Sequence, residues 1–415
     1  MPSTPTQVID RLTCQCDDEA TNLVTSHENF GEVARHVEEE ASDAESPILA
    51  EVTAAGGDET LKGMANFSAP ELDALWALGE PPVTIAWTQG RGRKPSISGK
   101  DALFVTLTVF KHFDTWQKHA IDFNIGMSTL EKMVHRVIRT IEPVQYPQMV
   151  KRVTVANQVE SGNAFRNYPH ALYATDIKFQ PAYRPNGRFT EQKVYFSAKH
   201  KLYGFKIECS VAPPGLAVDV SDHSPGSCSD VTMMLDRLTV HRQMLRKDDT
   251  SGPEIGGEPP QFPDMWAVLV DKGYQGEGRV LRTIQPKKKP RGETLDRDDL
   301  ARNRAVSSDR VLVKNFFGRM CMLWKATYAT FKWNENRFDS VARLCTALTN
   351  FHVGLMPLRA RDSDNYDMVL AKYQSMGDRV RTQRARAQRH YRMRQQLRSR
   401  PAPYAIRHSA FCLSA

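Results

Sequence analysis

A series of strand-like segments, interrupted by one helical segment, constrains the fold more than any other feature of the chain. Four segments are rich in β-branched and aromatic residues and are separated by Gly-containing turns: residues 171–179, 193–198, 203–211 and 216–220. A helical segment, Asp230 to about Leu245, then precedes the apolar strand Trp266 to Val270. Several strands, a helix and another strand predict an α/β fold with a mixed sheet.

Helices are expected on both sides of this region. Residues 308–326 form an amphipathic pattern with Ser307 or Ser308 as its cap, and a second pattern has an apolar face of Val341, Leu344, Leu348 and Phe351. The fold is therefore expected to close with helices that flank the sheet.

A small all-α region is predicted ahead of the sheet, between Lys100 and Ile141. A short helix at 116–123 is separated from a helix at 129–140 by a Gly-containing turn, with Ser128 as the expected N-cap. This pattern is typical of a helix-turn-helix, although an ordinary helical hairpin has the same spacing. The basic charge of the chain favours the helix-turn-helix and predicts DNA contacts from the outer face of the second helix, through Lys132, Arg136 and Arg139.

The charge of the chain is distributed unevenly. Residues 1–60 hold fourteen acids against two arginines, a net charge of −12, whereas the remaining residues hold 54 basic and 34 acidic side chains, a net charge of +20. Such an excess favours a polyanionic partner, because each neutralised phosphate releases counterions. Charge alone does not separate DNA from RNA.

The two ends of the chain differ in composition from the middle. Residues 1 to about 65 are acidic, poor in aromatic residues and interrupted by Gly56-Gly57, so we expect a flexible arm that screens the basic surface, recruits a partner or only aids solubility. The segment Arg379 to Arg400 holds nine arginines and predicts a solvated helix or disorder. The expected organisation is an arm at 1–80, a helix-turn-helix region at 81–150, a sheet domain at 165–357 and a basic tail at 358–415.

Two further basic segments are candidate DNA contacts. Arg91 and Arg93 lie in a Gly-rich segment whose thin backbone suits a narrow minor groove, although a basic linker has the same composition. A loop before the last helices holds four cations and predicts a phosphate clamp, a nuclear import signal or a solvated loop. These cations are Lys287, Lys288, Lys289 and Arg291.

The seven cysteines are scattered and form no paired CxxC spacing, which favours a reducing compartment. Cys14 and Cys16 could bind a metal with His27 or His36, but the spacing matches no zinc pattern and an exposed arm is favoured. No apolar run approaches the roughly 18 residues of a membrane span, and the N-terminus lacks a signal pattern. We therefore expect a soluble, unsecreted protein with no membrane partner.

Two acids are candidates for a catalytic centre. Asp176 lies inside a predicted strand, and Asp271 directly follows the strand Val268-Leu269-Val270. A carboxylate on the buried side of a strand is costly unless it is paired or metal-bound, whereas one at a strand end is commonplace. Taken alone, the pair is compatible with either a catalytic or a structural role.

The order of these pieces resembles the Harbinger-like DDE transposase and nuclease family, over roughly Lys100 to Pro357. The resemblance rests on Asp176 together with an ordered set of segments: KVYFSAKH at 193–200, PGSCSD at 225–230, VDKGY at 270–274, residues 303–310 leading into VKNFFG at 313–318, and LTNFH at 348–352. It implies a helix-turn-helix ahead of a ribonuclease-H-like nuclease domain, DNA as the partner and the nucleus as the location. Members of this family often act with a separate DNA-binding protein, so the resemblance allows for such a partner here.

The resemblance also implies a metal site. In that family two aspartates and a glutamate hold two divalent ions, Mg²⁺ or Mn²⁺, that activate water and stabilise the leaving oxygen. Asp176 and Asp271 match the two aspartates, but the position of the glutamate is Lys314. An ammonium cannot ligate Mg²⁺ and would compete with the ion for the aspartates. Asp309 is a poor substitute, because five helical residues turn through about 500°, and Asp230 resembles an accessory or structural acid.

Three hypotheses follow. The first is a transposase-derived DNA-binding protein whose nuclease centre is impaired by Lys314. The second is an active DDE endonuclease in which another acid completes the site or the two aspartates suffice. The third is an interaction module for RNA or protein that uses the basic tail and the acidic arm, and it leaves the order of the segments unexplained.

Overall fold

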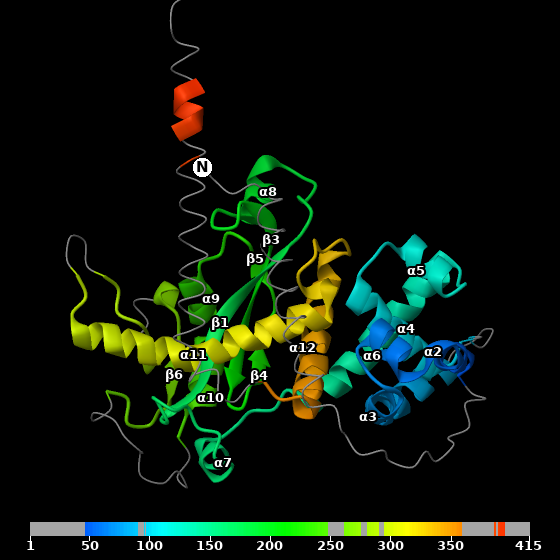
Figure 1. Ribbon diagram of the computed structural model, residues 1–415, viewed down its shortest axis with the longest axis horizontal. Coiled ribbons are helices and arrows are strands. Elements are labelled where there is room, and N and C mark those ends of the chain that lie inside the picture. Colours follow the sequence, from blue (N-terminus) through cyan, green and yellow to red (C-terminus); the bar gives the residue numbers. More distant parts are fainter. Residues whose placement is uncertain are drawn as a thin grey trace, which may run out of the picture. The chain divides into compact units, whose positions relative to one another are not determined.

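The computed structural model describes residues 46–89, 95, 97–247, 261–274, 280–289, 294–358, 386 and 389–394. The chain divides into two compact units, Met1–Ala360 and Arg361–Ala415. In the second unit the described residues, 386 and 389–394, are helical and exposed. The sheet and all the helices labelled in Figure 1 belong to the first unit.

A mixed sheet of seven strands forms the centre of the first unit, counted over the described residues. Its strands are β1 (Ala171–Pro181), β2 (Phe196–Ser197), β3 (Leu202–Ala212), β4 (Leu216–Val220), β5 (Ser224–Pro225), β6 (Ala267–Leu269) and β7 (Thr283–Ile284). Strand β1 pairs antiparallel with β3 and parallel with β6, β4 extends the antiparallel side, and β7 extends the parallel side. The predicted mixed α/β sheet is confirmed, and the order β4-β3-β1-β6-β7 is consistent with a ribonuclease-H-like fold.

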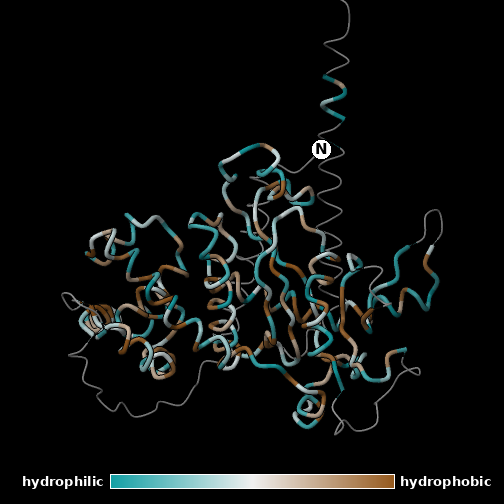
Figure 2. The backbone as a smooth tube through the Cα atoms, turned by 180° about the vertical axis from the view of Figure 1, so that it is seen from behind, coloured by the Kyte–Doolittle hydropathy of each residue, from teal (hydrophilic) through white to brown (hydrophobic). Residues whose placement is uncertain are grey.

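Both faces of the sheet are buried, because successive residues of β6 and the residue after it belong alternately to two hydrophobic clusters. Ala267 and Leu269 belong to one hydrophobic cluster, and Val268 and Val270 belong to the other. The first face is covered by α11 (Arg297–Leu323) and α12 (Phe338–Leu355), and the second by α9 (Asp230–Asp236) and α10 (Leu238–Leu245). Figure 1 shows α11 crossing the sheet in front of β1, and Figure 2 shows hydrophobic segments gathered in the strands.

Two predicted elements differ from the structure in their bounds. The predicted strand at 193–198 begins in the last two residues of helix α8 (Phe189–Val194), and only Phe196–Ser197 pairs with β3, because β5 occupies the next stretch of that edge. Helix α11 begins well before the predicted Ser307, because Asp296 caps it by accepting a hydrogen bond from the backbone N–H of Asp299 at 2.6 Å.

The prediction of an arm through residue 80 was wrong for residues 46–80, which form α2 (Pro47–Ala65) and much of α3 (Ala69–Thr88). The glycine pair kinks α2 but does not end it. Leu49 and Leu61 are buried, and the Leu49 N–H donates to Asp101 of α4 (Gly99–His112) at 3.0 Å. Tertiary packing therefore outweighs the low helix propensity of the glycine pair. Residues 1–45, with the cysteine and histidine pairs considered as metal ligands, lie outside the described residues.

The remaining N-terminal helices follow the predicted order, although the last long helix ends at Met149 instead of residue 140. They are α4 (Gly99–His112), α5 (Trp116–Asp122) and α6 (Met127–Met149), followed by the short α7 (Val155–Glu160). The prediction of Ser128 as an N-cap was wrong, because Gly126 occupies the cap and α6 begins at Met127. Within the described residues, no helix combines the length and apolar character needed to cross a membrane.

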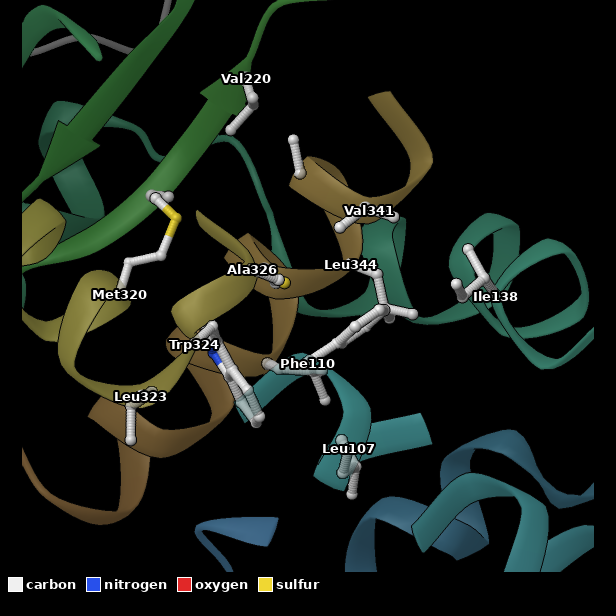
Figure 3. Packing of buried hydrophobic residues seen from close by; sticks show 14 of the residues in the cluster. Leu107, Phe110, Ile138, Val220, Met320, Leu323, Trp324, Ala326, Val341 and Leu344 are labelled. Carbon is white, nitrogen blue, oxygen red and sulfur yellow. The ribbon is translucent and has the colours of Figure 1, made fainter. Parts of the chain in front are cut away.

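The helical region and the sheet share one hydrophobic core. Phe110 of α4, Trp324 at the end of α11 and Leu344 of α12 point toward one another in Figure 3, and the rings of Phe110 and Trp324 lie 6.5 Å apart. Helix α6 packs along α12. Side chains on α6 and on the sheet domain are therefore held in a fixed relation to each other.

Candidate active site

Strand register brings the two candidate aspartates together. Ala174 of β1 pairs in parallel with Leu269 of β6, and each aspartate lies two residues further along its own chain. Because side chains repeat every second residue along a strand, Asp176 and Asp271 project from the same face at neighbouring positions. Asp176 also accepts a hydrogen bond from the Ile177 backbone N–H at 2.9 Å.

A guanidinium lies beside both carboxylates. Arg310 of α11 donates from Nη1 to Asp271 Oδ1 at 2.9 Å, and its Nη2 lies 3.6 Å from Asp176 Oδ2. The Arg310 side chain is 4% exposed. Sequence reasoning missed this residue, although its position four residues before Lys314 places the two on one face of the helix.

Lys314 completes a group of four that we call the acidic centre: Asp176, Asp271, Arg310 and Lys314. Lys314 is exposed on α11, and its charge favours the ionised forms of both aspartates. Burial raises the pKa of Asp176, although Arg310 acts against it. Burial acts in the same direction on Asp271, but there Arg310, a hydrogen bond from the Lys272 backbone and Lys314 outweigh it, and the pKa is lowered.

The side chains of the acidic centre do not fit a two-ion site. A pair of divalent ions needs several carboxylate oxygens, and nowhere in the described part of the chain do three or more His, Cys, Asp or Glu residues gather to hold a metal. Asp309 is turned away and accepts hydrogen bonds from Asn167 and Tyr168. Asp230 pairs with Lys206 at 3.0 Å. Neither acid replaces the carboxylate that is missing at Lys314.

The predicted DNA contacts fall into different environments. On α6, Lys132 and Arg139 are exposed, whereas Arg136 is half-buried, donates to the Ala86 carbonyl and lies 4.9 Å from the ring of Trp87. The side chain is therefore used to hold α3 against α6. Three further candidates lie outside the described residues: Arg91, Arg93 and Arg291.

The basic loop after β7 is held against α11. The Lys287 ammonium pairs with Asp299, and Asn303 both accepts from the Lys287 N–H at 2.6 Å and donates to its carbonyl at 3.0 Å. Lys288 and Lys289 are exposed. Only these two of the four predicted clamp residues are both described and unpaired.

Two polar networks that sequence reasoning missed support the domain. Buried Glu208 of β3 accepts from Arg237 at 2.7 Å and lies 2.9 Å from His241, which ties α10 to the sheet. His223 lies between Asp339 and Glu335, at 2.9 and 3.0 Å, and ties the end of β4 to α12. No local pattern indicates either network, because the partners are distant in sequence.

Comparison with known proteins identifies the kind of domain that carries the acidic centre. Residues 172–350 match the family model described as DDE superfamily endonuclease. The chain is 19% identical over 265 residues to a Microchaete diplosiphon protein named "Probable transposase for insertion sequence element IS702". The aligned residues cover 64% of this chain and 84% of that protein. No solved structure matches significantly. DDE superfamily nucleases generally use divalent metals. Residues 172–350 therefore form a DDE transposase-type nuclease domain.

Proposed function

We propose that this chain is a DNA-binding protein derived from a Harbinger-like DDE transposase, and that its acidic centre no longer supports metal-dependent phosphodiester hydrolysis or strand transfer. The observation that carries the proposal is the pairing of Arg310 with Asp176 and Asp271, beside Lys314. Two cations offset the two carboxylates. A divalent ion would have to displace the guanidinium and would then find no third acid.

DNA binding is supported by the order of two helices and by charge. Helix α5, a turn at 123–126 and helix α6 follow one another, and Lys132 and Arg139 are exposed on α6. The +20 charge of residues 61–415 supplies the long-range attraction. A nuclear location, with exposed Lys288 and Lys289 in the import signal, and a separate DNA-binding partner complete the proposal.

A cleavage and binding assay tests the proposal. The purified full chain is incubated with duplex DNA carrying terminal repeats, with Mg²⁺ or Mn²⁺, and binding is measured in parallel by fluorescence anisotropy. The expected result is binding without cleavage. Mg²⁺-dependent cleavage that is lost in Asp176→Ala would overturn the proposed impairment.

A variant designed to restore the metal site tests whether Arg310 and Lys314 prevent metal binding. Arg310→Ala combined with Lys314→Glu removes both cations and restores the third acid, so we expect a Mg²⁺ or Mn²⁺ binding signal in calorimetric titration that the wild type lacks. The matched control is Arg310→Ala with Lys314→Gln, which removes the same charges without adding a ligand. Equal metal binding by the two double variants would show that Lys314 does not lie at a ligand position.

A further inference from the structure

An open pocket of about 780 Å³ lies where α6 meets the 3₁₀ helix η5 (Glu335–Arg337) and the first turn of α12. We call it the basic pocket. Helix α6 contributes Ser128, Lys132 and Arg139, and the nuclease domain contributes Asn336, Arg337 and Ser340. The pocket thus combines residues from the two regions that the shared core holds together.

The cations of the basic pocket lack acidic partners. Within the described residues, the side chains of Lys132, Arg139 and Arg337 are exposed, and none of them forms an ion pair or a hydrogen bond. By contrast Arg343, one turn further along α12, pairs with Glu142 of α6 at 2.6 Å and with Asp222. The same two helices therefore neutralise an arginine just outside the pocket and leave three cations unneutralised inside it.

The rest of the lining keeps this charge positive. Arg136 adds a fourth cation, and Glu131 is the single acid among the lining residues. His135 packs edge-on against the stacked rings of Trp116 and Trp333, and burial lowers its pKa to about 4, so it is uncharged at neutral pH. Four cations face one carboxylate.

The walls of the pocket are held before any ligand arrives. Glu335 of η5 accepts from the Tyr195 hydroxyl at 2.9 Å and lies 3.0 Å from His223. Asn334 caps η5 through the Asn336 N–H. A site that is fixed in advance loses little conformational entropy on binding.

We propose that the basic pocket binds the phosphodiester backbone of duplex DNA, so that α6 and the η5–α12 junction hold the same backbone segment. The assignment rests on the proposed DNA-binding function and extends it to Arg337 of the nuclease domain. Arginine, lysine, serine and asparagine are among the side chains that contact phosphate oxygens in protein–DNA complexes. Guanidinium groups also match phosphate geometry better than a point charge does.

The size of the pocket fits a backbone segment better than a free phosphate ion. Lys132 and Arg139 are seven residues apart on α6, which is roughly 10 Å along the helix axis. That distance corresponds to about three nucleotide rises of 3.4 Å along one strand. The three unpaired cations are thus spread over more than one phosphate.

The salt dependence of binding tests the proposal. The affinity of the full chain for a fluorescent duplex of about 30 base pairs is measured between 50 and 200 mM salt, a range over which contacts to phosphate weaken strongly. Loss of one phosphate contact makes the slope of log affinity against log salt shallower by about 0.9. We expect this change in Arg337→Ala and in Lys132→Ala, and a retained slope in Arg337→Lys. Arg242→Ala is the matched control, because Arg242 is an exposed arginine on α10 outside the pocket.

The outcomes separate this inference from the proposed function. A wild-type chain that does not bind DNA overturns the proposed function. Wild-type binding with Arg337→Ala and Lys132→Ala indistinguishable from Arg242→Ala overturns the basic pocket and leaves DNA binding in place. The pocket assignment is also overturned when these variants weaken binding to a single-stranded RNA of equal length but not to the duplex. The Lys132→Ala variant keeps the test decisive should Arg337→Ala fold poorly.

Discussion

The acidic centre and the basic pocket use the same kinds of cation in opposite ways. In the acidic centre, Arg310 is 4% exposed and lies between two carboxylates. In the basic pocket, Arg337 is exposed and, within the described residues, has no acidic partner. One arginine neutralises an internal charge, and the other leaves its charge available to a ligand.

This difference shows why net charge alone does not locate a nucleic-acid site. Lys287, Arg310 and Arg343 count equally toward the basic composition, yet each is paired with an acid within the first unit. A charge that is already neutralised releases few counterions when DNA arrives. The unpaired cations, rather than all cations, therefore locate the proposed DNA surface.

The largest expected effect on stability tests whether the helical region and the sheet domain depend on one hydrophobic core. Trp324 is fully buried, donates from Nε1 to Thr349 at 3.2 Å and packs against Phe110 of α4. We expect Trp324→Ala to lower the free energy of unfolding by about 3–5 kcal/mol in urea titrations, because it leaves a large cavity. Trp324→Phe is the control that keeps a ring in place and costs less.

Trp324→Ala should destabilise the helical region and the sheet domain together, because Trp324 lies between the helical region and α12. DNA affinity of the folded fraction is therefore expected to fall along with stability. A Trp324→Ala chain that loses stability but binds DNA with wild-type affinity and salt slope would show that the basic pocket does not depend on this core.

The next largest effect on stability tests the acidic centre, where an arginine is paired with carboxylates. Arg310→Ala leaves the buried-side carboxylate of Asp176 without its counter-charge, so we expect a loss of about 3 kcal/mol in the free energy of unfolding, measured in metal-free buffer. Adding Mg²⁺ should not recover this loss, because Lys314 remains beside the two aspartates and, within the described residues, no third acid is present.

Arg343→Ala is the matched control for that measurement. Arg343 also contacts two acids, Glu142 and Asp222, but its side chain is 25% exposed and one of its partners is 75% exposed. Its removal is expected to cost no more than about 1 kcal/mol. Equal losses in the two variants would mean that Arg310 does not hold the acidic centre together.

Part of this fold and site could be predicted from the sequence, because the relevant signals are local. The β-branched and aromatic residues of β1 and β3 define strands whose bounds agree with the structure within a few residues. The 3.6-residue pattern also predicted helices at the positions of α4 and α6, although α6 ends at Met149 instead of residue 140. Asp176 and Asp271 were placed together through the resemblance, and strand register explains their proximity.

The remaining features depend on partners that are distant in the chain. Helix α2 is stabilised by Leu49 donating to Asp101, more than 50 residues away, which a composition-based prediction of an arm cannot include. Arg310 meets Asp271 across 39 residues of sequence. Arg337 and α6 are farther apart still, so no window of sequence reveals that their charges share one pocket.

A smaller effect contrasts two cations of the same helix. Arg136 is engaged with the Ala86 carbonyl and the Trp87 ring, so Arg136→Ala should lower the free energy of unfolding by about 1–2 kcal/mol. Lys132→Ala should change stability by no more than about 0.5 kcal/mol but should make the salt slope shallower by about 0.9. Urea unfolding and anisotropy titrations measure the two quantities on the same samples. Arg136→Ala with the larger slope change would reverse the assignment of roles on α6.

The smallest expected effect concerns the support of η5 beneath Arg337. Burial acts to lower the pKa of His223, but hydrogen bonds to Asp339 and Glu335 outweigh it and leave the pKa above its ordinary value of 6.5. A raised pKa means that this stabilisation is complete below about pH 6.5 and is lost as the pH rises through the folded-state value. We therefore expect the stability advantage of the wild type over His223→Gln, at most about 1 kcal/mol, to shrink with rising pH in urea titrations. His112→Gln serves as the control of opposite sign, because burial lowers the pKa of His112. An advantage over His223→Gln that grows with pH would show that the charged ring does not hold η5 in place.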